Sequence, residues 1–216
     1  MPRAKFLIDD PMRRNFVQVV SVAPLEAMLF RTIDISGQIE VDTDNILDKP
    51  AASFTVPVES LDGGIPLLTE TLRSERWIDA VKFPKIVFSL ARLVTPTTPT
   101  PLKDGVPISI TAEGTFEFHG VSKKYPIKGE ITWQKANENT ARRLPGDVLR
   151  LRASFDLNLR EHGVEAHLSA QTFGKVAETL VGTIDLFAST ERPVIPEKML
   201  GELARAKREL GQRLSG

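Results

Sequence analysis

The sequence contains no cysteine, and its 28 Lys and Arg residues are balanced by 28 Asp and Glu residues, so its net charge is zero. The lack of cysteine excludes disulfides, thiolate nucleophiles and cysteine-ligated zinc or iron–sulfur centres. The lack of a basic excess argues against nucleic acid as a partner, because proteins that bind phosphate backbones usually carry one. Apolar residues are abundant: they make up 41% of the chain, enough for a sizeable core.

The sequence also lacks a long hydrophobic run. The apolar stretch near the N-terminus ends at Ile8 and is followed directly by Asp9 and Asp10, so no secretory signal peptide is visible. No uncharged stretch approaches the roughly 20 residues that a membrane-spanning helix needs. We therefore expect a cytoplasmic protein without a membrane span.

Candidate catalytic and metal-binding residues are few. The three histidines are His119, His162 and His167, and their spacing matches no metal-binding motif. The sequence has no Gly-x-Ser-x-Gly nucleophile motif and no glycine-rich phosphate loop. Residues 119–125 combine several polar types, which we interpret as a tight hairpin-like bend with solvated lysines. The sequence therefore predicts no metal site and no enzymatic activity; an enzyme acting on an apolar substrate would depend on His119 and His162 alone.

Apolar and polar residues alternate along much of the chain, as is typical of β-strands with one buried face. The alternating segments are 32–41, 52–58, 108–118, 127–133, 151–159 and 180–188. Segments 16–22 and 85–93 are apolar on both faces, and we expect strands buried on both sides there. About eight strands result, a number whose closed barrel leaves room for packed side chains or one small ligand. The sequence thus predicts an all-β protein built around an antiparallel barrel.

The segments between these strands are rich in turn-forming residues. Asp62, Gly63 and Gly64 form a turn signal. Residues 95–107 contain several prolines, which lack the N–H that a strand ladder requires, so we expect a loop there. Residues 135–147 are polar and predict a second exposed loop.

Two segments have a helical spacing of apolar residues. Residues 66–80 predict a short helix, or helical turns, inserted in the barrel. Residues 197–214 predict an amphipathic C-terminal helix, whose apolar stripe consists of Met199, Leu203, Ala206, Leu210 and Leu214. We therefore divide the chain into a barrel domain, residues 1–195, and a helix, residues 196–216, packed on the barrel or on a partner subunit.

Three blocks of sequence form a pattern more specific than alternation. Residues 54–64 read Phe-Thr-Val-Pro-Val-Glu-Ser-Leu-Asp-Gly-Gly. Residues 71–88 read Thr-Leu-Arg-Ser-Glu-Arg-Trp-Ile-Asp-Ala-Val-Lys-Phe-Pro-Lys-Ile-Val-Phe, and residues 114–123 read Gly-Thr-Phe-Glu-Phe-His-Gly-Val-Ser-Lys. In content, order and separation these blocks resemble the YceI-like polyisoprenoid-binding family. With weaker likeness on both sides, the resemblance covers about residues 32–189.

The resemblance implies a lipocalin-like, elongated antiparallel barrel with a helix near one end. It also implies a non-catalytic protein that binds, stores or transports a long apolar ligand in its lumen. That ligand would be a polyisoprenoid or an isoprenoid quinone, with no other cofactor required, and such proteins are often homodimers. Many members of the family are exported, a trait that we do not carry over because no signal peptide is visible here.

Two features depart from the family's pattern. The family usually carries a histidine in its first strands, whereas residues 30–35 contain none. Leu159 stands where the family tends to have an arginine. Both differences remove polar groups that could contact a ligand head group, so the resemblance supports an apolar lumen more strongly than any particular head group.

The residues expected to line the lumen are large apolar residues of the predicted strands. They are Phe54, Val56, Phe88, Ile110, Phe116, Phe118, Trp133, Phe155, Leu157 and Ile184. Alternation shows which residues share a face, but not which face points inward. The alternative is a barrel that these side chains fill completely, which would act as an interaction or structural module without a lipid ligand.

Overall fold

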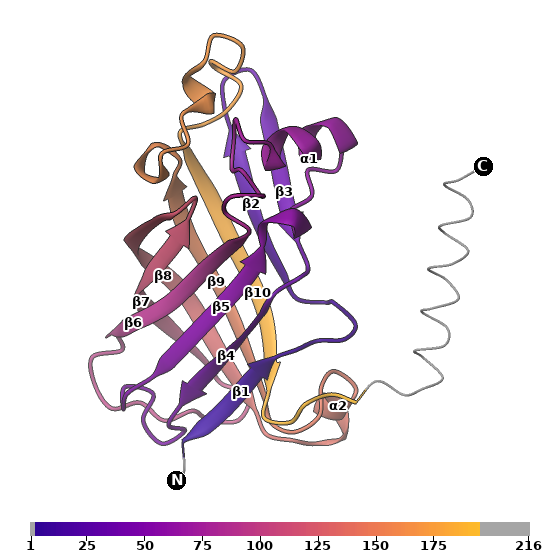
Figure 1. The fold of residues 1–216 in the computed structure, drawn as a ribbon. Coiled ribbons are helices and arrows are strands. Elements are labelled where there is room, and N and C mark those ends of the chain that lie inside the picture. The colour runs from indigo at the N-terminus through magenta and orange to yellow at the C-terminus, as the bar shows by residue number, and fades with distance from the viewer. Residues whose placement is uncertain (1–2, 195–216) are drawn as a thin grey trace, which may run out of the picture.

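Alternating apolar residues form ten antiparallel strands in the computed structural model, which describes residues 3–194 (Figure 1). The strands are β1 (Ala4–Ile8), β2 (Phe16–Val22), β3 (Ala27–Thr32), β4 (Ser36–Val41), β5 (Ala51–Pro57), β6 (Lys85–Thr95), β7 (Pro107–Phe118), β8 (Val121–Gln134), β9 (Val148–Asn158) and β10 (Thr179–Ser189). The helical elements are short: η1 (Val58–Ser60), α1 (Pro66–Arg73), α2 (Glu138–Ala141), η2 (Arg160–His162) and η3 (Ala166–Leu168).

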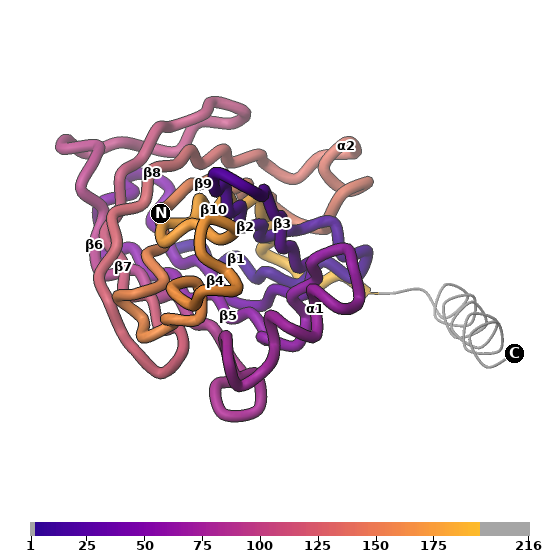
Figure 2. Tube along the Cα trace, turned by 90° about the horizontal axis from the view of Figure 1, so that it is seen from above, coloured from indigo at the N-terminus to yellow at the C-terminus, as the bar shows by residue number. Residues whose placement is uncertain are grey.

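Eight of the ten strands form a closed ring. The order around the barrel is β1, β4, β5, β6, β7, β8, β9 and β10, and the ring closes where β10 meets β1 (Figure 2). The β2–β3 hairpin pairs with another part of the same β10 edge. From β4 to β10, strands that follow one another in the chain are also neighbours in the sheet, which is the simplest way to connect antiparallel strands. The eight-stranded antiparallel barrel predicted from the sequence is confirmed.

The edge of β10 is shared by three segments, and this seam closes the barrel. β2 pairs with β10 at five positions, whereas β1 contributes one pair, Leu7 with Ser189. Between them, the side-chain amide of Asn15 accepts a hydrogen bond from the N–H of Phe187 at 2.9 Å and donates one to its C=O at 3.0 Å. Asn15 is 2% exposed and takes the place of a backbone partner where water has little access.

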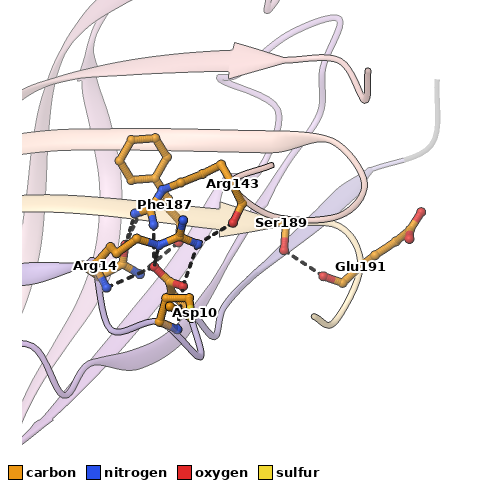
Figure 3. A network of polar contacts seen from close by, with 8 residues as sticks. Asp10, Arg14, Arg143, Phe187, Ser189 and Glu191 are labelled. Atoms are coloured by element: carbon orange, nitrogen blue, oxygen red, sulfur yellow. Dashed lines mark hydrogen bonds and ion pairs between the residues drawn. The ribbon is translucent and has the colours of Figure 1, made fainter. Parts of the chain in front are cut away.

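A partly buried ionic network anchors the segment between β1 and β2 beside this seam (Figure 3). The carboxylate of Asp10 accepts hydrogen bonds from Arg143 at 2.6 Å and from two nitrogens of Arg14, each at 3.0 Å. Burial raises the pKa of Asp10, but hydrogen bonds from Arg14 and from the backbone N–H of Met12 outweigh it and hold the pKa below its ordinary value. The guanidinium of Arg143 also lies 4.1 Å from the centre of the Phe187 ring, so the network is tied to β10.

The two ends of the barrel differ. At the end that carries α2, which we call the α2 end, the loops around residues 42–50 and 96–106 are joined by backbone hydrogen bonds. Ile46 and Leu102 from these loops are buried in the core and plug this end. The opposite end, which we call the α1 end, carries α1 and the long segment between β9 and β10 (Figure 1).

The prediction of one strand over residues 32–41 is wrong. β3 ends at Thr32 and β4 begins at Ser36. The hydroxyl of Thr32 accepts a hydrogen bond from the backbone N–H of Asp34 at 3.0 Å, a local side-chain bond that competes with the strand ladder. Ile33 is consequently 40% exposed, although it alternates with buried residues in the sequence.

Segments 16–22 and 85–93 are strands, β2 and most of β6, but they are not buried on both sides as expected. β6 carries the exposed residues Ser89 and Arg92, because the outer face of the barrel is open to solvent there. β1 and β3 were not predicted, since each is short and has too few residues to show a clear period. The proline-rich loop is confirmed between β6 and β7, and the polar loop before β9 is confirmed and contains α2.

The helical predictions have different outcomes. α1 covers the first half of residues 66–80, and turns follow it. The bend predicted at residues 119–125 is shorter than expected: only His119 and Gly120 form the turn between β7 and β8, and residues 121–125 belong to β8. The predicted helix at 197–214 lies outside the described residues, so the division into a barrel and a C-terminal helix stays a prediction. Within residues 3–194, no helix is long and apolar enough to cross a membrane.

Replacing Asn15 by Ala should lower the free energy of unfolding by about 2–4 kcal/mol, because two buried backbone groups of Phe187 lose their partner. Urea denaturation measures this difference. Asn139→Ala, at an exposed position of α2, is the matched control and should stay within about 0.5 kcal/mol of wild type. An Asn15→Ala variant as stable as wild type would show that the amide does not support the seam.

Asp10 should make stability depend on pH in the acid range. Its pKa is lower in the folded protein than in the unfolded chain, so its stabilising contribution is present above about pH 4 and is lost as the pH falls further. Asp10→Asn keeps the shape of the side chain and removes the charge. Urea denaturation at a series of pH values should therefore show a shallower acid decline for the variant; parallel curves would contradict this account.

Candidate ligand-binding lumen

The barrel encloses an apolar cavity near its α1 end, which we call cavity 1. Its volume is about 150 Å³, and strands from around the barrel contribute to its lining together with α1 and the turns that follow. The lining includes Thr71, which is exposed, and Met28 and Leu68, which are partly exposed. Cavity 1 is not fully enclosed, and because its exposed lining residues belong to β3 and α1, we infer that it opens between these two elements and call this opening the mouth.

A second apolar cavity, cavity 2, has a volume of about 80 Å³ and extends toward the α2 end, where Ile46 forms part of its lining. Four residues line both cavities: Phe54, Phe88, Ile127 and Ile184. The two cavities are therefore consecutive parts of one lumen, and these four side chains lie at the boundary between them.

The structure divides the ten residues predicted to line the lumen into three groups. Cavity 1 is lined by eight of them, namely Phe54, Val56, Phe88, Phe116, Phe118, Phe155, Leu157 and Ile184. Ile110 lines cavity 2 only, and Trp133 lines neither cavity but packs against the core at the α2 end. Their position on the inner face is an observation, whereas their contact with a ligand stays a prediction.

Sequence reasoning missed lining residues of two kinds. Leu72 and Trp77 belong to α1 and the turn after it, where alternation carries no information. Tyr125 lies in β8, two residues before Ile127, and therefore on the same face of the strand as the alternating residues at 127–133. Extending that segment toward the N-terminus would have found it. Leu159, at the family's arginine position, is also buried in the lining of cavity 1 and makes this part of the lumen apolar.

Phenylalanine rings in the lumen lie over glycines of neighbouring strands. The rings of Phe54 and Phe88, which are cross-strand neighbours, are stacked with centroids 5.6 Å apart and planes 10° from parallel. A Cβ at Gly114 would lie 1.9 Å from the Phe88 ring, and a Cβ at Gly182 would lie 2.3 Å from the Phe155 ring. Any larger residue would displace these rings, so the glycines fix where the aromatic surface of the lumen lies.

A polar cluster borders cavity 1 at the α1 end. His162 is fully buried, and its Nδ1 donates to the backbone carbonyls of Phe118 and Val121, each at 3.1 Å. Its Nε2 lies 3.0 Å from the hydroxyl of Tyr125, whose single proton can be donated to this nitrogen or to a carboxylate. The same hydroxyl lies 3.2 Å from the carboxylate of Glu161.

Burial determines the ionisation of this cluster. It lowers the pKa of His162, and this outweighs the hydrogen bonds to the carbonyls of Phe118 and Val121, which raise it. Burial, followed by the negative charge and hydrogen bond of Glu161, raises the pKa of Tyr125 to about 12. At neutral pH the cluster therefore presents a neutral imidazole and a neutral phenol beside the lumen.

The other hydroxyls in the lining of cavity 1 are also engaged by the protein. The hydroxyl of Ser21 accepts a hydrogen bond from the N–H of Ala177 at 2.9 Å, and that of Thr71 donates to the carbonyl of Leu67 at 2.7 Å. Residues 3–194 contain no group of three or more His, Asp and Glu side chains placed to hold a metal ion. The arrangement suits an apolar molecule held mainly by hydrophobic contact.

A closed antiparallel barrel with an apolar lumen is a lipocalin-like fold. The model of the YceI-like domain matches residues 17–186, most of the chain, and the chain belongs to this family. The family resemblance drawn from the three sequence blocks is thereby confirmed. No curated protein matches the chain.

Solved structures show the same fold. BcnA of Burkholderia cenocepacia is 14% identical with a TM-score of 0.64, over 84% of this chain and 100% of that one. A polyisoprenoid binding domain from Saccharophagus degradans, implicated in plant cell wall breakdown, is 15% identical with a TM-score of 0.64, over 89% of this chain and 100% of that one. The YceI protein of Campylobacter jejuni is 15% identical with a TM-score of 0.60, over 75% of this chain and 85% of that one.

The polar cluster can be tested directly because the chain contains only one tyrosine. An ultraviolet absorbance titration of the phenol should give a pKa of about 12 for Tyr125 in the folded protein. In denaturant the same titration should give about 10. Circular dichroism at each pH shows whether the barrel is still folded, and a value near 10 in the folded protein would contradict the buried arrangement.

Proposed function

We propose that this protein binds, stores or carries an apolar molecule in its lumen, and that the molecule is a polyisoprenoid or an isoprenoid quinone. The observation that carries the proposal is cavity 1, an apolar space of about 150 Å³ that reaches the surface beside α1. Membership of the YceI-like family supports a binding role. The likeness to a structure described as a polyisoprenoid binding domain supports the choice of ligand class.

Hydrophobic burial is sufficient to bind such a ligand. Each methylene removed from water contributes about 0.8 kcal/mol, so six buried carbons contribute on the order of 5 kcal/mol before the entropy cost of binding. A hydrogen bond to a head group would add about 1 kcal/mol. Because the hydroxyls of Ser21, Thr71 and Tyr125 are already bonded within the protein, affinity should depend mainly on how the apolar chain fits.

The size of the lumen limits how much of a ligand it can hold. An engineered cavity of about 150 Å³ in another protein binds benzene, so cavity 1 accommodates about one isoprene unit in this conformation. The remainder of a long polyisoprenoid would extend through the mouth beside α1. The proposal is therefore that the protein holds the apolar end of a chain, with the head group toward solvent.

The proposed function includes no chemical step. Both ring nitrogens of His162 are hydrogen-bonded to protein groups, and Nδ1 of His119 lies 2.9 Å from the carbonyl of His162, so both side chains have structural partners. The alternative of a completely filled barrel is less well supported, because the interior contains two cavities. A homodimer, a cytoplasmic location and the lack of a required cofactor stay predictions.

Native mass spectrometry of protein freshly purified from its natural host tests the proposal. The expected spectrum contains a bound mass that is extractable into organic solvent and identifiable as an isoprenoid. Leu157→Trp, which adds volume at the wall of cavity 1, should weaken binding of an added isoprenoid at least about tenfold.

The matched control is Asp156→Trp, which places the same side chain at the neighbouring, exposed position of β9. It should leave binding unchanged. Absence of bound lipid in the native protein, together with no uptake of a polyprenol or a quinone in vitro, would refute the proposal.

A further inference from the structure

The boundary between cavities 1 and 2 is formed largely by two aromatic rings. Of the four side chains that line both cavities, Phe54 and Phe88 are the largest, and they are stacked face to face. They project from adjacent strands, β5 and β6, at directly opposed positions of the ladder. Ile127 of β8 and Ile184 of β10 complete the boundary, so strands on several sides of the barrel form it.

The position of the aromatic pair is fixed by the backbone beneath it. The Phe88 ring lies over Gly114 of β7, where a Cβ would come within 1.9 Å of it. A glycine inside a long strand weakens that strand. Gly114 is explained by the space that the Phe88 ring needs at this position. Phe54 is 7% exposed, and its ring is held in place by stacking against the Phe88 ring.

We infer that the stacked pair Phe54–Phe88 sets the length of apolar chain that the lumen accepts, by closing cavity 1 off from cavity 2. This inference rests on the proposed function. A chain that enters through the mouth beside α1 fills cavity 1 and stops at the pair. Cavity 2, with its volume of about 80 Å³, lies beyond and would take up to one further isoprene unit if the rings were smaller.

The inference predicts where affinity stops increasing with chain length. In wild type, carbons beyond cavity 1 remain in solvent at the mouth. Dimethylallyl alcohol, geraniol and farnesol, which have one, two and three isoprene units, should therefore bind with nearly equal dissociation constants. In Phe88→Leu the barrier becomes smaller and the chain reaches cavity 2. Geraniol should then bind about tenfold more tightly than dimethylallyl alcohol, because the carbons of its second unit are buried, and farnesol should bind no more tightly than geraniol.

Three further variants make the result specific. Phe54→Leu removes the other ring of the pair and should have the same effect. It keeps the inference testable if Phe88→Leu does not fold. Phe187→Leu also replaces a phenylalanine by leucine, but one that lines neither cavity, and should leave the wild-type affinities for dimethylallyl alcohol and geraniol unchanged. Ala112 lines cavity 2 alone, so adding Ala112→Leu to Phe88→Leu should fill the new space and restore the wild-type pattern.

Calorimetric titration of each folded variant with the three prenols measures these constants. The same length dependence in wild type, Phe88→Leu and Phe54→Leu would overturn the inference while leaving the proposed function intact. A wild type that already prefers geraniol over dimethylallyl alcohol by about tenfold would also overturn it. If neither wild type nor any variant binds a prenol, the inference is refuted, whereas the proposed function is refuted only if the native protein also carries no lipid and takes up no quinone.

Discussion

The whole structure depends on satisfying the edge of β10. A sheet that does not close leaves a row of unpaired N–H and C=O groups, and a barrel removes them only if its last strand finds partners along its full length. Here no single strand provides them: β2 pairs with one part, β1 with another, and the amide of Asn15 fills the position between. The buried Asp10–Arg143 ion pair stabilises the segment that carries Asn15, so a small group of polar residues maintains a large apolar interior.

The character of the lumen follows from how its wall and ends are built. Alternation places one face of every long strand inside, glycines at 114 and 182 leave room for phenylalanine rings, and Ile46 and Leu102 plug the α2 end. What remains is an apolar space that reaches the surface at the α1 end. Polar side chains along it, including Tyr125, are bonded to the protein itself, which leaves hydrophobic contact as the main source of affinity.

The sequence predicted the barrel well because period-two alternation and barrel geometry have the same cause, a wall with one apolar face. The same signal placed Phe54, Phe116 and Phe155 on one face of their strands, and the structure shows that this face lines cavity 1. It could not reveal the role of Asn15 or Asp10, because their partners lie far along the chain. It also missed the break after Thr32, where a side-chain hydrogen bond overrides the apolar pattern.

The seam also determines when the protein can acquire its structure. Asn15 and the strand residue it pairs with are 172 positions apart in the chain. During synthesis, the segments that form β1 and β2 leave the ribosome long before β10 exists, and the inner faces of β4 to β9 stay exposed until it arrives. Pairing over such a distance is slow because much chain entropy must be lost before any contact forms. Closure of the barrel by the final strand therefore competes with aggregation of the incomplete sheet.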